Sequence, residues 1–130
     1  MNIGFDAKRA FHNSTGLGMF SRVLINLIAH HYPRHEYFLY NPKPGNLFVP
    51  DRANIHEVQP HSILQKSLKS VWRSKWIISD LKRDKIDLFH GLSHEIPVGI
   101  DKTKIKSIGK CKNGKRSNHK GHGIHIRILF

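Results

Sequence analysis

The sequence contains a single cysteine and no long hydrophobic run. Cys111 cannot form an intramolecular disulfide, and it has no zinc-ligand neighbours at a recognised spacing. No stretch approaches the roughly 20 apolar residues of a transmembrane helix. The N-terminus lacks the basic and apolar regions of a secretory signal peptide. We therefore expect a cytoplasmic protein that is at most peripheral at the inner face of the membrane.

Acidic residues are also scarce, and they are unevenly placed. The chain has 9 acidic and 22 basic residues, a net charge of +13. All the acids lie between Asp6 and Asp101, whereas residues 109–130 contain six basic residues and no acid. Such a tail is typical of adhesion to nucleic acid or to an anionic membrane. Aromatic residues for base stacking are nearly absent after Phe89, where only Phe130 follows. We expect weak adhesion through the tail rather than dedicated recognition.

The rest of the chain alternates short apolar stretches with helical patterns. This alternation is typical of an α/β protein with a Rossmann-like parallel sheet flanked by helices. Strands are expected at residues 2–6, 35–41, 54–58, 86–91 and 104–108, with a further short strand possible at about 47–49, and helices are expected at about 17–31 and 62–84.

Both expected helices carry an apolar face at three- and four-residue spacing. In the first, we expect burial of a face that includes Leu17, Phe20, Leu24 and Leu27. A polar loop, residues 7–15, precedes this helix, with Ser14 and Thr15 as candidate caps. In the second helix the expected buried stripe is Leu64, Leu68, Val71, Ile78 and Leu81, with Trp72 and Trp76 beside it in or near the core.

Several of these stretches together resemble a known enzyme family. Ile3-Gly4-Phe5-Asp6, Thr15-Gly16-Leu17-Gly18 before a helix, and Asp87-Leu88-Phe89-His90-Gly91-Leu92-Ser93 followed by Pro97 occur in a characteristic order. In that order they resemble the N-terminal domain of GT-B glycosyltransferases of family 4. The resemblance covers residues 1–108.

This resemblance implies transfer of a sugar from a nucleotide-sugar donor to a glycan or lipid-linked acceptor, with no metal or cofactor. In such enzymes two Rossmann-like domains face each other, the N-terminal one holding the acceptor and the C-terminal one the nucleotide. By resemblance, Gly16, Leu17 and Gly18 approach the donor diphosphate. Catalytic residues stay unassigned.

Further candidates follow from position in the expected sheet. Ligands settle at the carboxyl ends of parallel strands. We therefore take four residues at or beyond the end of the expected strand 86–91 as acceptor-binding candidates: His90, Ser93, His94 and Glu95. Asp6 ends the first strand, where it is either an acid in the cleft or a member of a loop ion pair.

The family pattern stops after Ile108. The strand there lacks the family's closing His-Asp pair, and residues 109–130 show little periodicity. We expect residues 1–108 to be a partial, acceptor-side domain and residues 109–130 a disordered or non-native basic tail, as a truncated or frameshifted gene would produce. His119, His122 and His125 lack a further ligand, so no metal site is expected there.

Two functions therefore stay open. One is a glycosyltransferase fragment that is inactive alone. The alternative is a small basic protein that binds nucleic acid or an anionic surface through its tail.

Overall fold

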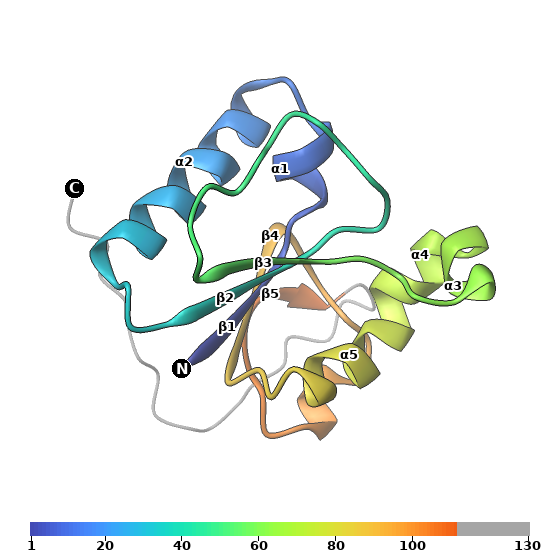
Figure 1. Cartoon of the computed structure of the whole chain (residues 1–130). Helices are drawn as coiled ribbons and strands as arrows, with labels where there is room; N and C mark the ends of the chain where they lie inside the picture. Colours follow the sequence, from blue (N-terminus) through green and yellow to red (C-terminus); the bar gives the residue numbers. More distant parts are fainter. Residues whose placement is uncertain (112–130) are drawn as a thin grey trace.

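The computed structural model describes residues 1–111, except the side chains of His94, Lys110 and Cys111. The described part forms one sheet of five parallel strands in the order β3-β2-β1-β4-β5 (Figure 1). This order equals that of the first five strands of a Rossmann sheet. The prediction of an α/β protein with a parallel sheet flanked by helices is confirmed. The strands are β1 (Asn2–Asp6), β2 (Glu36–Tyr40), β3 (Ile55–Val58), β4 (Leu88–Ile96) and β5 (Lys106–Cys111).

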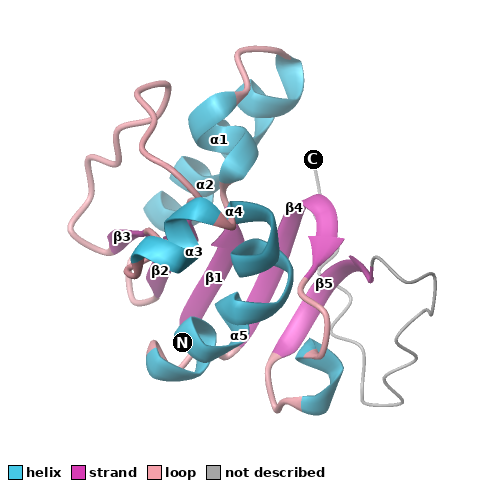
Figure 2. Ribbon diagram, turned by 90° about the vertical axis from the view of Figure 1, so that its right-hand side faces the viewer, coloured by secondary structure: helices cyan, strands magenta, loops and turns pink. Residues whose placement is uncertain are grey.

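Helices cover both faces of the sheet. The β1–β2 connection contains α1 (Lys8–His12) and α2 (Gly16–His31). The β3–β4 connection crosses the other face, which Figure 2 views from the front. It contains α3 (Ile63–Ser67), α4 (Lys69–Val71), a π-helix (Trp72–Trp76) and α5 (Ile77–Arg83), and a 3-10 helix (Ile100–Lys102) precedes β5. No helix within residues 1–111 is both long and apolar enough to cross a membrane.

Each face has its own hydrophobic core, because successive residues of β1 point to opposite faces. Ile3 and Phe5 pack with buried residues of α1 and α2. Gly4 points to the opposite face, where a Cβ would lie 3.1 Å from the side chains of Phe89 and Tyr40. A glycine in the central strand therefore lets large aromatic rings pack close to the sheet.

The first crossover differs from the sequence prediction in two ways. Residues 8–12 of the expected polar loop form α1, because Ala10 and Phe11 are buried in the core. The helix expected at 17–31 is present as α2, but its predicted buried face is wrong. Its fully buried residues are Gly18, Ser21, Ile25 and Ala29, whereas Leu17, Phe20 and Leu27 are exposed. Small side chains let α2 approach its neighbours closely, and this packing overrides the apolar periodicity.

The contact between α1 and α2 explains which face of α2 is buried. A Cβ on Gly18 would lie 1.8 Å from the Asn13 carbonyl oxygen, so only glycine allows this approach. Arg22 Nη1 donates hydrogen bonds of 2.9 Å to the carbonyls of Ala10 and Asn13, at the end of α1. The side chain of the N-cap residue, Thr15, accepts no capping bond. Ser14 and Thr15 therefore do not cap α2 through their hydroxyls within the described structure.

The second crossover is not the continuous helix that was expected over 62–84. The helical axis is interrupted at Leu68, and five residues from Trp72 to Trp76 adopt π-helical geometry. Leu64 and Leu68 of the predicted stripe are exposed, while Leu81 is buried. Trp72 is fully buried and Trp76 partly buried, which confirms their predicted place in or near the core.

The last two strands run further than expected. β4 continues through residues 92–96, which were predicted to be loop, and its pairing with β5 shifts register between His90 and Glu95. Gly91 permits this irregularity, because a Cβ there would lie 2.1 Å from the Glu95 carbonyl oxygen. β5 pairs as far as Cys111, beyond the predicted end at Ile108.

Candidate functional site

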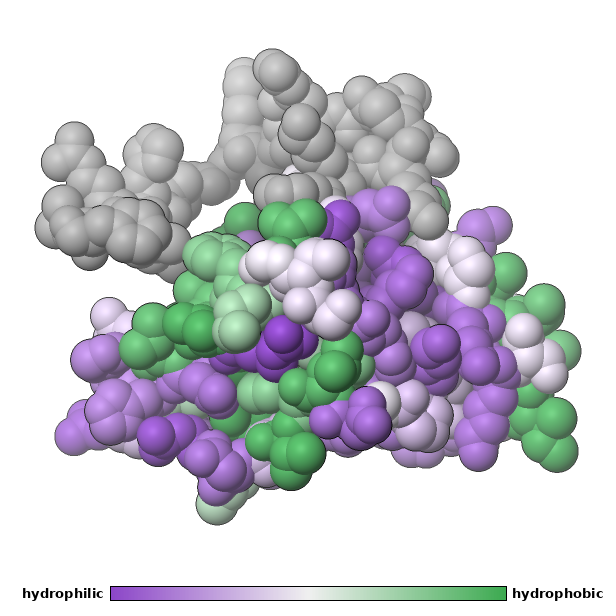
Figure 3. Space-filling model, turned by 90° about the horizontal axis from the view of Figure 1, so that it is seen from above, coloured by the Kyte–Doolittle hydropathy of each residue, from purple (hydrophilic) through white to green (hydrophobic). Residues whose placement is uncertain are grey.

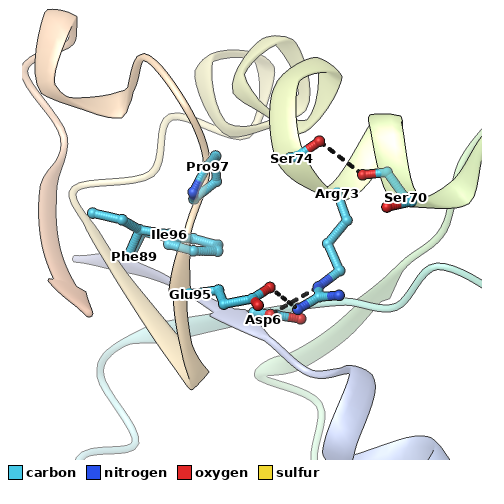
Figure 4. Close-up of a pocket in the computed structure, with 8 residues that line it drawn as sticks. All are labelled: Asp6, Ser70, Arg73, Ser74, Phe89, Glu95, Ile96 and Pro97. Atoms are coloured by element: carbon cyan, nitrogen blue, oxygen red, sulfur yellow. Dashed lines mark hydrogen bonds and ion pairs between the residues drawn. The ribbon is translucent and has the colours of Figure 1, made fainter. Parts of the chain in front are cut away.

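A charged cluster lies where β1 and β4 end side by side. Asp6 is the last residue of β1, and Glu95 lies one residue before the end of β4. Arg73 reaches both from the π-helix: its Nε donates to Asp6 Oδ2 at 3.0 Å and its Nη2 to Glu95 Oε2 at 2.7 Å (Figure 4). The chain leaves β1 towards β2 on one side, and β4 lies on the other. This is the topological switch point, where open α/β sheets bind ligands.

The three charges differ in burial. Asp6 is only 3% exposed, whereas the Glu95 side chain is 43% exposed. Burial raises the pKa of Asp6 above its ordinary value of 3.8, because a desolvated carboxyl favours its neutral form. The Arg73 guanidinium opposes this rise in pKa through its charge and its hydrogen bond. Arg73 therefore compensates a deeply buried carboxylate with one edge and holds a solvent-accessible carboxylate with the other.

The π-helix brings Arg73 to the strand ends. Trp72 is anchored in the core, where its Nε1–H donates to Asp80 Oδ2 at 2.8 Å. On the other side, the carbonyl of Ser74 accepts a 2.7 Å hydrogen bond from the backbone N–H of Val98, just after β4. With its two neighbours fixed in this way, Arg73 is directed at the sheet. Single π-turns of this kind occur frequently at functional sites.

The cluster forms the floor of a small hollow. Its volume is about 10 Å³, enough for roughly one water molecule. Arg73 spans the space between Asp6 and Glu95 and so limits the depth (Figure 4). A larger ligand would contact the rim in this conformation. The lining residues are Asp6, Ser70, Arg73, Ser74, Phe89, Glu95, Ile96 and Pro97.

The structure separates the four acceptor-binding candidates. Glu95 lies in the hollow. His90 lies on the opposite face of β4, where its ring contacts Phe5 with 5.8 Å between centroids. Ser93 is half-buried in the irregular part of β4 and does not line the hollow. The side chain of His94 lies outside the described part. Glu95 is thus the one candidate among the described side chains that the fold brings to the switch point.

The three residues predicted to approach a diphosphate form the first turn of α2. Gly16 borders open space and Leu17 is exposed, so both are accessible. Gly18 is buried against the Asn13 carbonyl. Its role in this structure is the close packing of α2 against the end of α1. None of the three lines the hollow.

Sequence reasoning missed Arg73. It lies between two tryptophans of the expected helix and was not singled out there, and only the π-turn directs it to the sheet. One signal was present: Asp6 ends a strand expected to be central and buried, and a buried carboxylate requires a cation or hydrogen-bond donors. The sequence does not indicate which of 22 basic residues supplies that cation.

A second polar cluster lies at the ends of β2 and β3. Asn41 is fully buried, its Nδ2 donating to Glu57 Oε1 at 2.8 Å and its Oδ1 lying 2.8 Å from His12 Nε2. Gln59 Nε2 also donates to Glu57, at 2.7 Å. These bonds connect α1 to β2 and β3. Because the partners satisfy one another, the cluster has the character of a structural brace.

Within the described part of the chain, no group of three or more His, Cys, Asp or Glu residues is placed to hold a metal ion. The histidines at 119, 122 and 125 lie outside that part, as does the basic tail from residue 112 onward, whereas residues 109–111, predicted to belong to the tail, form the end of β5. Comparisons of the chain with protein-family models, with curated proteins and with solved structures gave no match.

Proposed function

We propose that this chain is the acceptor-side part of a GT-B glycosyltransferase of family 4, which transfers a sugar from a nucleotide-sugar donor to a glycan or lipid-linked acceptor. The observation that carries the proposal is the cluster of Asp6, Arg73 and Glu95 at the switch point of a parallel sheet. The strand order and the accessible glycine turn at Gly16 support it further.

The proposed site suits a hydroxyl-rich ligand. Carboxylate oxygens accept and guanidinium N–H groups donate hydrogen bonds, so together they can bind neighbouring hydroxyls of a sugar ring. Glu95 is the accessible carboxylate, and Ser70 and Ser74 add polar groups at the rim. Asp6 is too deeply buried to meet a sugar directly. In this proposal Asp6 is a positioning residue, whose charge fixes the orientation of Arg73.

Sugar transfer also requires the donor to be aligned with the acceptor and the leaving diphosphate to be neutralised. The hollow between β1 and β4 is far too small to enclose either a nucleotide or a sugar ring, since pockets for drug-sized ligands measure roughly 300–1,000 Å³, so the acceptor is proposed to bind across its rim. We therefore assign donor binding chiefly to groups beyond residues 1–111. A transferase assay on this chain alone is expected to show no turnover, while acceptor binding is expected to remain.

Acceptor binding can be tested by saturation-transfer NMR with neutral oligosaccharides and, separately, nucleotide sugars. Under the proposal oligosaccharide signals gain saturation, and Glu95→Gln weakens binding by about tenfold, the value of a charge-assisted hydrogen bond. Glu36→Gln is the matched control, because Glu36 is an exposed carboxylate at the opposite end of the sheet. Absence of oligosaccharide binding, or equal weakening by both substitutions, would overturn the proposal.

The alternative, a basic protein that binds nucleic acid or anionic surfaces, remains a prediction that depends on residues 109–130. It predicts binding that falls steeply with salt and disappears when these residues are deleted. Binding to RNA that survives the deletion would remove that alternative.

A further inference from the structure

The outward face of α2 carries large apolar side chains that nothing within residues 1–111 buries. Leu17, Phe20 and Leu27 are between 50% and 55% exposed, and Leu24 between them is half-buried. Met19 and Val23 flank them and are also exposed. In Figure 3 the hydrophobic colouring gathers on the left, on the side where α2 lies. We call the set Leu17, Met19, Phe20, Val23, Leu24 and Leu27 the α2 stripe.

The α2 stripe is not a consequence of a poor fit between α2 and the sheet. The opposite side of the helix is already fully packed through Gly18, Ser21, Ile25 and Ala29. Rotating α2 to bury the stripe would destroy the close contact of Gly18 with Asn13 and both hydrogen bonds of Arg22. The helix thus has two packing faces: one of small residues, which is buried, and one of large apolar residues, which nothing in the described part of the chain covers. Contiguous exposed apolar patches of this kind usually mark an interaction site.

We propose that the α2 stripe packs against the α2 stripe of a second copy of this chain, with the two helices antiparallel about a twofold axis. The spacing favours a helix as partner. Positions 17, 20, 24, 27 and 31 alternate steps of three and four, which is the seam of two helices packed side by side. This proposal is independent of the proposed function.

The charges of α2 favour a copy of itself. The helix contains no acidic residue, and its one arginine, Arg22, is engaged with backbone carbonyls of α1. A self-complementary contact therefore brings no carboxylates together. Antiparallel packing also sets the positive end of each helix dipole beside the negative end of the other, and it keeps His30 and His31 of the two copies apart.

The exposed apolar area of the α2 stripe is large enough for a weak dimer. A half-exposed leucine or phenylalanine still presents roughly 100 Å² of surface, so the stripe offers roughly 500 Å² per copy, and the pair would reach the roughly 1,000 Å² expected of a specific interface. A contact of this size is expected to dissociate in the micromolar range. A further exposed apolar group lies on α3, but this helix has only five residues and is too short to form such a seam.

Sedimentation equilibrium of the full chain tests the proposal. The mass is expected to rise from one to two copies over micromolar concentrations. Phe20→Glu and Leu27→Glu should each weaken association by at least about tenfold, because they place charges in the apolar contact. Ile63→Glu, on α3, is the matched control: Ile63 is more exposed than any residue of the stripe, and its substitution should leave the mass unchanged. Far-ultraviolet circular dichroism shows that each variant is folded.

Disulfide cross-linking tests the antiparallel geometry in a Cys111→Ser background. Position 24 lies near the middle of α2, so Leu24→Cys should cross-link to its own copy, whereas Leu17→Cys should not. A monomer at all concentrations, a dimer that resists both glutamate substitutions, or equal cross-linking at positions 17 and 24 would each overturn the proposal.

Discussion

The two helical crossovers cover opposite faces of this sheet, and they differ in which side chains they bury. In the first, the short helix α1 is followed by the long, regular helix α2, which buries small side chains and leaves most of its large ones exposed. The second uses a broken helix, which buries Trp72 completely and turns Arg73 towards the strand ends. The regular helix α2 thus leaves a large apolar surface that nothing within residues 1–111 covers. The irregular helix places Arg73 in the candidate site. The difference shows that packing, rather than apolar periodicity, decides which face of a helix is buried.

The largest loss of stability is expected from substitution of Trp72, which anchors the broken helix in the core. Trp72→Ala removes a fully buried indole and the hydrogen-bond donor of Asp80, and should lower the free energy of unfolding by about 3–5 kcal/mol. Urea denaturation measures this. Trp76→Ala is the control and should cost less, because Trp76 is only partly buried. Equal losses would mean that Trp72 does not anchor the π-helix.

Removal of the Arg73 guanidinium should lower the free energy of unfolding nearly as much. Arg73→Met leaves the buried Asp6 without its counter-charge and should cost about 3 kcal/mol at pH 7. The double variant Arg73→Met/Asp6→Asn should recover much of this loss, because no buried charge is left. Lys75→Met, on the exposed side of the same turn, should leave stability almost unchanged. Urea denaturation of the wild type and these three variants measures their free energies of unfolding. A double variant no more stable than Arg73→Met would contradict the role of Arg73 as the counter-charge of Asp6.

A smaller and more local effect is expected on α2. Gly18→Ala places a Cβ against the Asn13 carbonyl and should destabilise the fold by about 1–3 kcal/mol through overpacking. Gly16→Ala adds a Cβ in open space at the start of the same helix and should be neutral or stabilising by up to about 1 kcal/mol. Thermal melting of both variants checks the contrast, and a harmless Gly18→Ala would refute the packing role.

The smallest expected effect is a dependence of stability on pH through Asp6. The pKa of Asp6 is raised by burial in the folded state, so the native protein holds this proton more tightly than the unfolded chain. The contribution of Asp6 to stability should therefore fall as pH rises from about 3.8 through the folded pKa. The total fall should be larger and extend to higher pH in Arg73→Met, because Arg73 lowers this pKa. Carboxyl carbon NMR of Asp6 measures the pKa directly, and a value at or below 3.8 contradicts the prediction.

Much of the fold was accessible from the sequence. Apolar runs bounded by turn residues located all five strands, and the proline after α2 marked its end. The further short strand considered at about 47–49 is absent, since residues 47–49 form no strand. The candidate site was less accessible. Asp6 was named because it ends the first expected strand, and Glu95 was named because it lies beyond the carboxyl end of the expected strand 86–91. Their pairing with Arg73 was not, because it joins residues 67 and 22 positions apart through a π-turn with no clear local signal.

By itself, the sequence determined the parallel α/β architecture, because burial of central strands and helix periodicity are local patterns. The tertiary structure alone decided which faces are buried and which charges meet. Gly18 selects the inner face of α2 by contact with a carbonyl that precedes the helix, and the anchoring of Trp72 and Ser74 selects Arg73 as the partner of Asp6. Both choices depend on close packing between segments, which no single stretch of sequence encodes.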